Sequence, residues 1–157
     1  VATFKAQVLK PLLLEKVKES TLNWHEIITL ASLIEKETGL DSERKIISSV
    51  FHNRLRKNMR LQTDPTVIYA IEKFDGNIRK HDLKIDSPYN TYRYKGLPPG
   101  PIANPGLKSI VAAISPIKSD HLYFVSRQDG SHHFSSTLNE HNRAVQKYQL
   151  NKVHYQK

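Results

Sequence analysis

Two glutamates at the end of a very apolar segment are the first residues that could do chemistry. Glu35 and Glu37 lie two positions apart within residues 34–38. Helical residues two apart point roughly 200° away from each other, so one carboxyl can face the interior while the other faces water. Glu37 continues an apolar stripe with Leu33 and Ile34, and burial raises a carboxyl pKa toward the range that a general acid needs. The alternative is a surface position at a frayed helix end.

Asp64 is a second candidate, in the run Arg60 to Pro65. Its carboxylate could take part in catalysis. Equally, Thr63 or Asp64 could be the N-cap of a short helix with Pro65 as the first helical residue, and the local pattern favours this cap.

The segments Tyr89–Tyr92 and Gly96–Ile102 combine amide, hydroxyl and aromatic groups with a stiff Pro/Gly loop. Rings stack on sugar faces and amides bind hydroxyls, so these segments suit sugar recognition. An ordinary surface turn is the alternative.

A metal site is not expected from the histidines. His132 and His133 are adjacent, with His121 and His141 nearby in the sequence, and neighbouring strand residues point to opposite faces. The chain contains no HExxH motif and no cysteine. We therefore expect no metal and no cofactor.

Composition limits the function classes. The chain has 157 residues, 38% hydrophobic and 25% charged, enough apolar content for the core of one ordinary domain. The absence of cysteine excludes disulfide scaffolds and cysteine nucleophiles. No apolar run reaches the ~18 residues of a membrane helix. Because the first residue is Val1 rather than Met, we expect a processed chain or a piece of a longer protein.

The net charge of +9 favours an anionic partner: nucleic acid, a membrane surface or an acidic polymer. Basic residues gather at positions 54–60 and 79–84, where they are expected to decorate a solvated face. A nucleic-acid-binding module is the remote alternative, because aromatic residues are not interleaved and no DNA-binding motif is present.

The elements that must position these residues are mainly helices. Apolar spacing predicts a helix over residues 2–20, interrupted at Pro11, and a buried helix from Trp24 to Glu37 with Asn23 as N-cap and Gly39 closing it. Asp41 is expected to cap a third helix.

The sequence of the second half of the chain predicts a long loop and a hairpin. Proline-rich turns fill residues 62–105, interrupted by a short helix near 66–73. Asn104 and Pro105 should begin a helix that runs to about Ser115. Two strands, residues 122–125 and 132–134, should join through Asp129-Gly130, and Thr137 with Glu140 should cap a last helix. Helices plus a small antiparallel hairpin give an α+β fold.

Taken together, the motifs resemble the endolytic murein transglycosylases of the MltG (YceG-like) family. The resemblance covers about residues 28–148 and lies in these runs: Ala31–Thr38, Phe51–Leu55, Met59–Tyr69, Tyr89–Tyr92, Gly96–Ile102, Asn104–Gly106, Leu122–Val125 and Asn139–Asn142. Small departures are His52, where an aliphatic residue is expected, and Asn104, where Thr is expected.

The resemblance implies a mostly helical, lysozyme-like catalytic domain. Residues 1–22 would be a connector from a missing upstream region, and residues 23–157 the catalytic domain. It also implies cleavage of the β-1,4 bond between N-acetylmuramic acid and N-acetylglucosamine within a glycan strand, with a 1,6-anhydro end. Glu37 would be the catalytic glutamate, and the remaining site residues would bind substrate: Asn53, Arg54, Gln62, Thr63, Asp64, Tyr69, Asn90 and Tyr92.

For the cell, the resemblance implies a periplasmic or extracytoplasmic domain on a protein held in the inner membrane by one N-terminal helix. Its partners would be peptidoglycan and the peptidoglycan synthases, and its role the termination of glycan strands. Two nearer alternatives stay open: a hydrolytic muramidase that uses Glu37 and Asp64, and a peptidoglycan-binding domain without catalysis.

Overall fold

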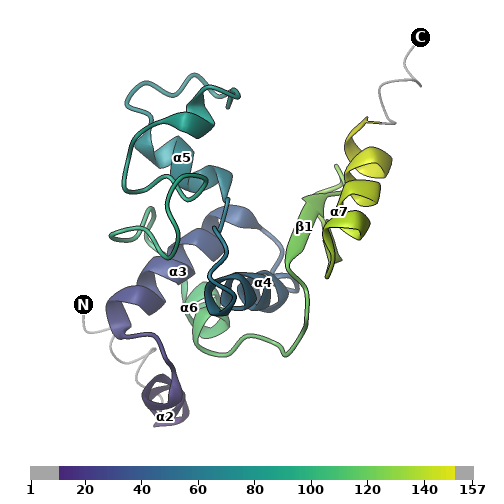
Figure 1. Ribbon diagram of the computed structural model, residues 1–157. Coiled ribbons are helices and arrows are strands. Elements are labelled where there is room, and N and C mark those ends of the chain that lie inside the picture. Colours follow the sequence, from purple (N-terminus) through teal and green to yellow (C-terminus); the bar gives the residue numbers. More distant parts are fainter. Residues whose placement is uncertain (1–10, 151–157) are drawn as a thin grey trace.

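A computed structural model describes residues 11–150 of the chain (Figure 1). Its helical elements are α2 (Pro11–Glu19), α3 (Trp24–Glu37), α4 (Arg44–Arg56), α5 (Asp64–Ala70), the 3-10 turn η1 (Asp82–Lys84), α6 (Leu107–Ile114), α7 (Leu138–Val145) and the π-helical turn η2 (Gln146–Leu150). Strands β1 (Tyr123–Ser126) and β2 (His132–Ser135) form the single sheet among these residues. The α+β class predicted from the sequence is confirmed.

Helix α3 lies at the centre of the main lobe and packs against α4 and α6 (Figure 1). It has the predicted bounds, and Asn23 forms a capping box with Glu26. Five of its apolar residues are buried together with Phe51 of α4 and Ile110 of α6: Ile27, Leu30, Ala31, Leu33 and Ile34. Gly39 does not close the helix; Thr38 in extended conformation ends it.

Two helices start later than the sequence predicts. Asp41 accepts from Arg44 Nε at 3.0 Å and from Lys108 Nζ, so it does not cap α4. Residue Glu43 occupies the N-cap position instead. Helix α6 begins after Gly106, whose N–H donates to Glu35 Oε2 at 3.1 Å, rather than at Asn104 and Pro105.

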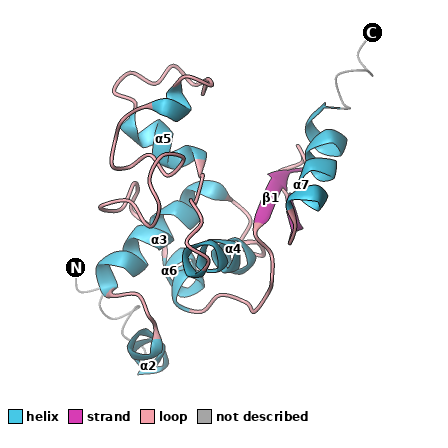
Figure 2. Ribbon diagram, viewed as in Figure 1, coloured by secondary structure: helices cyan, strands magenta, loops and turns pink. Residues whose placement is uncertain are grey.

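The hairpin and α7 form an arm that stands beside the main lobe (Figure 2). The strands pair antiparallel with Phe124 opposite Phe134, and the turn contains Gly130 with φ of 87°. Thr137 and Glu140 form the predicted capping box of α7. The rings of Phe51 and Phe124, 6.1 Å apart and edge-on, join the arm to α4.

The segment between α5 and α6 is mostly loop, as predicted, and packs on α3. Ile102 N donates to Ser32 Oγ at 3.0 Å, and His25 Nε2 lies 2.7 Å from the Pro99 carbonyl oxygen. These contacts hold the Pro/Gly run against the first and middle turns of α3.

Helix α2 packs on α6, and Lys16 Nζ donates to Ser115 Oγ at 2.8 Å. It begins at Pro11; the remainder of the predicted 2–20 helix lies outside the described residues. The division into residues 1–22 and 23–157 stays a prediction. Within residues 11–150, no helix combines the length and apolarity that crossing a membrane requires.

The capping box of α3 generates a stability prediction. Asn23→Ala removes the side chain that accepts the Glu26 N–H, so the free energy of unfolding should fall by about 1 kcal/mol. Urea titration followed by circular dichroism measures the change. Asn77→Ala, at an exposed loop position, is the control and should unfold like the parent; equal curves for all three chains would contradict the capping role.

Candidate active site

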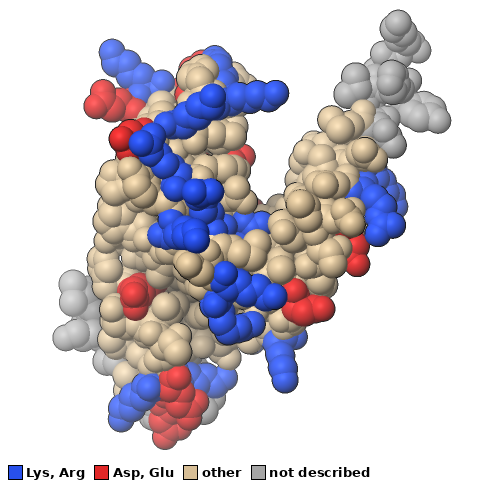
Figure 3. Space-filling model, viewed as in Figure 1, with Lys and Arg blue, Asp and Glu red and all other residues tan. Residues whose placement is uncertain are grey.

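The molecule is hollowed between the main lobe and the arm. Figure 3 shows this notch in the surface, and Figure 1 shows that the end of α3 lies at its base, between α5 and the hairpin. Glu37 is the last residue of α3. The residue singled out first from the sequence is thus placed where separate parts of the chain converge.

Glu37 is half-buried, and its carboxyl Oε1 accepts a hydrogen bond from Thr63 Oγ1. Burial raises the pKa of Glu37 from 4.5 to about 7, and the nearby charge of Asp64 adds to the increase. The Thr63 hydrogen bond and the charges of His132 and Arg54 act in the opposite direction. A carboxyl that titrates near neutrality can both donate and accept a proton.

Glu35 has the opposite environment, as its position on the other side of the helix predicts. Its Oε2 accepts from Ser109 Oγ at 2.6 Å and from Gly106 N, and it pairs with Arg44 at 3.3 Å. The Ser109 hydrogen bond is the largest cause that lowers the pKa of Glu35. Glu35 therefore remains an ionised structural carboxylate.

Thr63 is the N-cap residue of α5, but its side chain makes no capping hydrogen bond. Its hydroxyl is used on Glu37 instead. The Thr63 N–H donates to Thr91 Oγ1 at 3.1 Å, and the hydroxyls of Thr91 and Thr66 lie 2.8 Å apart. This buried threonine cluster fixes the position of the group that contacts the candidate acid.

Asp64 is not the N-cap residue of α5, and its carboxylate already has a hydrogen-bond partner. It is exposed, and its Oδ1 accepts from Tyr92 Oη at 2.5 Å. Burial and this hydrogen bond raise the pKa of Tyr92, so its hydroxyl keeps the proton. Asp64 and Tyr92 therefore form a hydrogen-bonded pair beside Glu37.

Arg54 departs from the predicted solvated basic face, because its side chain is buried. Its Nε donates to the Leu122 carbonyl at 2.6 Å, and one Nη donates to the Leu61 carbonyl at 2.9 Å and reaches Gln62 Oε1 at 3.4 Å. The guanidinium also lies 5.1 Å from the centre of the Tyr123 ring. Arg54 therefore ties the segment before α5 to the start of β1.

Gln62 and Tyr69 both keep exposed side chains. Gln62 has a left-handed φ of 51°, which is uncommon for a residue with a side chain, and its N–H donates to the Thr91 carbonyl at 3.2 Å. Tyr69 is 51% exposed, and its ring centre lies 4.8 Å from that of Tyr89. The two rings form an aromatic surface on α5 and the following loop.

Two residues predicted to bind substrate donate side-chain hydrogen bonds to backbone carbonyls. Asn90 is fully buried, and its Nδ2 donates to the carbonyls of Leu83 and Ile85. Asn53 is 4% exposed and donates to the carbonyls of Ser119 and His121. Their amide donors therefore already have partners in the folded chain, and the substrate-binding role of both residues stays a prediction.

Sequence reasoning missed one pair at the site. The His132 ring nitrogen Nδ1 donates to Glu43 Oε2 at 2.7 Å, and the His132 backbone N–H donates to Glu43 Oε1 at 2.8 Å. The two residues are 89 positions apart, so no local pattern connects them. The sequence pattern raises His132 only as a possible metal ligand, and no group of three or more acidic or histidine side chains in residues 11–150 could hold a metal ion.

Comparisons with known proteins agree with this architecture. The YceG-like family model matches residues 1–147. The chain is 50% identical over 133 residues to an endolytic murein transglycosylase of Bacillus subtilis and 38% identical over 143 residues to one of Streptococcus pneumoniae. It is also similar to the crystal structure of a YceG-like protein of Listeria monocytogenes, with a TM-score of 0.80 at 45% identity.

These matches cover most of this chain and only part of each relative. They include 85% and 87% of this chain for the two curated relatives and 91% for the crystal structure. The same matches span 37%, 26% and 45% of the respective partner chains.

The opposite environments of the two glutamates predict opposite effects on stability. Because the pKa of Glu37 is higher in the folded chain, its share of the free energy of unfolding falls as pH rises from 4.5 through about 7. Glu37→Gln has no carboxyl to titrate, so it avoids this loss. Between acid pH and a pH above neutral, the free energy of unfolding of the parent should therefore fall by on the order of 2–3 kcal/mol more than that of the variant. Urea unfolding across this pH range measures the difference.

Glu35→Gln is the matched control. Its lowered pKa contributes stability that is present at neutral pH and lost as pH falls through the acid range, so this variant should be destabilised most at neutral pH. If Glu37→Gln and the parent gave parallel stability curves, Glu37 would titrate as an ordinary surface carboxyl.

Proposed function

Because this chain belongs to the YceG-like family, we propose that it is the catalytic part of an endolytic murein transglycosylase. Its reaction would cleave the β-1,4 bond between N-acetylmuramic acid and N-acetylglucosamine inside a glycan strand and leave a 1,6-anhydro end. The observation that carries the proposal is the position of Glu37, half-buried at the end of α3 at the base of the notch, where burial raises its pKa to about 7.

One carboxyl is sufficient for this reaction. Protonated Glu37 gives its proton to the glycosidic oxygen as the bond from that oxygen to C1 breaks. The sugar's own 6-hydroxyl then attacks C1, and the Glu37 carboxylate takes the hydroxyl proton, which restores the acid. Since the nucleophile belongs to the substrate, attack is intramolecular, and a high effective molarity replaces an activated water.

The contacts of Asp64 favour this scheme over a two-carboxylate hydrolase. A second catalytic carboxylate would have to activate water or attack the sugar. Asp64 instead accepts the hydroxyl of Tyr92 at 2.5 Å. We assign this pair to substrate binding and to electrostatic support of the positively charged transition state.

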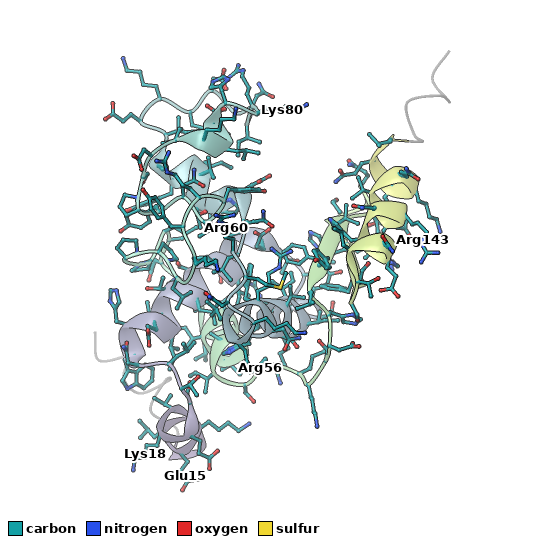
Figure 4. All side chains as sticks on the ribbon, in the orientation of Figure 1. Glu15, Lys18, Arg56, Arg60, Lys80 and Arg143 are labelled. Carbon is teal, nitrogen blue, oxygen red and sulfur yellow. The ribbon has the colours of Figure 1, made fainter. Side chains whose placement is uncertain are left out.

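Aromatic and basic groups of the main lobe suit the rest of the substrate. The rings of Tyr69 and Tyr89 offer a surface on which a sugar can stack. Figure 4 shows Arg56, Arg60 and Lys80 along one side of this lobe, and Figure 3 shows Lys and Arg side chains gathered there. These cations can attract the carboxylates of the peptide stems.

The cellular setting is part of the proposal. We assign the domain to the outer face of the bacterial inner membrane, in a longer protein anchored by an upstream helix. There it would work with peptidoglycan synthases and terminate glycan strands. The support is the family resemblance, and the positive charge is compatible with anionic lipids and cell-wall carboxylates.

Product analysis tests the reaction. Glu37→Gln should lower cleavage of purified sacculi by at least about 10²-fold, because Gln cannot supply the proton. Mass spectrometry should find anhydro products from the parent, lighter than hydrolytic products by roughly 18 Da, the mass of one water.

Glu15→Gln, at an exposed position on α2, is the control and should cleave like the parent (Figure 4). Reducing ends in the parent digest would favour the muramidase. Binding without cleavage by the parent would favour a non-catalytic domain.

The Thr63 hydrogen bond generates a prediction about pH dependence. Thr63→Val removes the donor that stabilises the Glu37 carboxylate, so the pKa of Glu37 should rise. The alkaline fall of kcat/KM should then move to a pH roughly 0.5 to 1 higher, with a lower maximal rate. Thr63→Ser keeps the hydroxyl and should keep the parental profile; a Val profile that is lower but unshifted would restrict Thr63 to a structural role.

A further inference from the structure

Arg54 of α4 is buried and binds two distant segments of the chain at once. The residue is 8% exposed. Its Nη1 donates to the carbonyl oxygens of Arg60 at 3.1 Å and Leu61 at 2.9 Å. Its Nε donates to the Leu122 carbonyl oxygen at 2.6 Å, where the arm begins. One guanidinium therefore fixes both the segment that leads into α5 and the segment that leads into β1.

The segment before α5 contains a turn that needs such support. Gln62 has a φ of 51°, in the left-handed region that residues with a side chain disfavour. A conformation of this kind is unfavourable and persists only where its surroundings fix it. Arg54 binds the carbonyl before Gln62 and reaches its Oε1 at 3.4 Å. The Thr91 carbonyl accepts the Gln62 N–H at 3.2 Å, so the turn is held from two sides.

Thr63 follows this turn directly, so the turn decides where its hydroxyl lies. Thr63 Oγ1 donates to Glu37 Oε1, and the Thr63 N–H donates to Thr91 Oγ1 at 3.1 Å. If Gln62 relaxed to a negative φ, the chain would leave it in another direction. The Thr63 hydroxyl would then lose its place on Glu37.

We propose that Arg54 is a positioning residue of the candidate active site: by holding residues 60–62 in their left-handed turn, its guanidinium keeps the Thr63 hydroxyl on the Glu37 carboxyl. The catalytic meaning of this role rests on the proposed function, whereas the structural link from Arg54 to Thr63 does not. The role differs from the substrate binding that the family resemblance implies for Arg54, because Nε and Nη1 donate to groups of the chain itself.

The shape of the guanidinium is what this role requires. Its Nε and Nη1 lie in one rigid plane and reach Leu122 and Leu61 together. A lysine ammonium is a compact charge on a flexible stem and does not reproduce this fork. Arg54→Lys therefore keeps the positive charge that acts on Glu37 and removes the positioning. This substitution separates the placement of Thr63 from the electrostatic influence of Arg54.

NMR titration of Glu37 tests the proposal without requiring activity, through the ¹³C resonance of its carboxyl, with Glu37→Gln to assign the signal. Arg54→Lys should raise the pKa of Glu37 by roughly 0.5 to 1, as expected for Thr63→Val, because both variants take the hydroxyl away from the carboxylate. In the double variant, Arg54→Lys should add nothing to the effect of Thr63→Val. A folded Arg54→Lys chain with the parental Glu37 titration, or an equal shift in both backgrounds, would overturn the proposal.

Asn53→Ala is the matched control for a general loosening of the fold. Asn53 is the neighbouring residue on α4, is also buried, and donates to the carbonyls of Ser119 and His121 in the segment before β1. The variant should lower the free energy of unfolding and leave the pKa of Glu37 unchanged, because residues 60–62 keep their contacts with Arg54. A shift as large as that of Arg54→Lys would reduce Arg54 to a structural role and overturn the proposal.

A second pair of variants decides the question if Arg54→Lys does not fold. Gln62 has an exposed side chain. Proline fixes φ at about −65°, so Gln62→Pro removes the left-handed turn and should raise the pKa of Glu37 by the same amount, while Arg54 keeps its charge. Gln62→Gly tolerates the turn and should keep the parental titration. An unchanged Glu37 titration in Gln62→Pro would refute the positioning role.

Failure of the proposed function would have a different result. Glu37 titrations that follow these expectations in a chain that does not cut sacculi would leave the positioning role of Arg54 standing and the proposed function wrong. Cleavage of sacculi by the parent, together with an unchanged Glu37 titration in folded Arg54→Lys, would show the reverse.

Discussion

The hydrogen bond from Thr63 to Glu37 is the contact on which the rest of the site depends. Burial alone would push the pKa of Glu37 too high for it to act as a carboxylate, and full exposure would keep it too low for it to act as an acid. The Thr63 hydroxyl and the nearby cations oppose burial, and the resulting pKa lies near 7. This balance requires several separate chain segments to meet at one helix end.

Helix termini supply those segments, and the N-cap side chains of α4 and α5 contact the site instead of capping their own helices. Thr63 and Glu43 both occupy N-cap positions, yet neither side chain caps its helix. Their side chains contact Glu37 and His132 instead. A missing N-cap costs about 1 kcal/mol, so each diversion gives up local helix stability for a tertiary contact at the site.

This diversion also explains which features could be predicted from the sequence. The α3 bounds, the capping boxes at Asn23 and Thr137, and the hairpin follow from residues close together in the chain. The helix starts predicted at Asp41 and Asn104 were wrong, and residues distant in the sequence contact both places. Asp41 binds Lys108, and Glu35 accepts the N–H of Gly106, the residue before α6. At the site, the sequence could predict that Glu37 lies on the apolar side of its helix. It could not predict the hydrogen bond between Glu37 and Thr63 or the pair formed by Glu43 and His132.

The place where α3 ends decides both the chemistry and the scaffold. Glu35 and Glu37 lie two positions apart, so the last turn of α3 points them to different sides. The ionised carboxylate of Glu35 faces α6, and the titratable carboxyl of Glu37 faces the notch. Thr38 ends the helix in extended conformation, and its hydroxyl accepts the Leu40 N–H at 3.0 Å while it also reaches Glu43. Had Gly39 ended the helix instead, Thr38 would continue it, and its hydroxyl would lose these contacts. The threonine after the acid therefore fixes the direction in which the chain leaves α3, and with it the approach of Glu43 to His132.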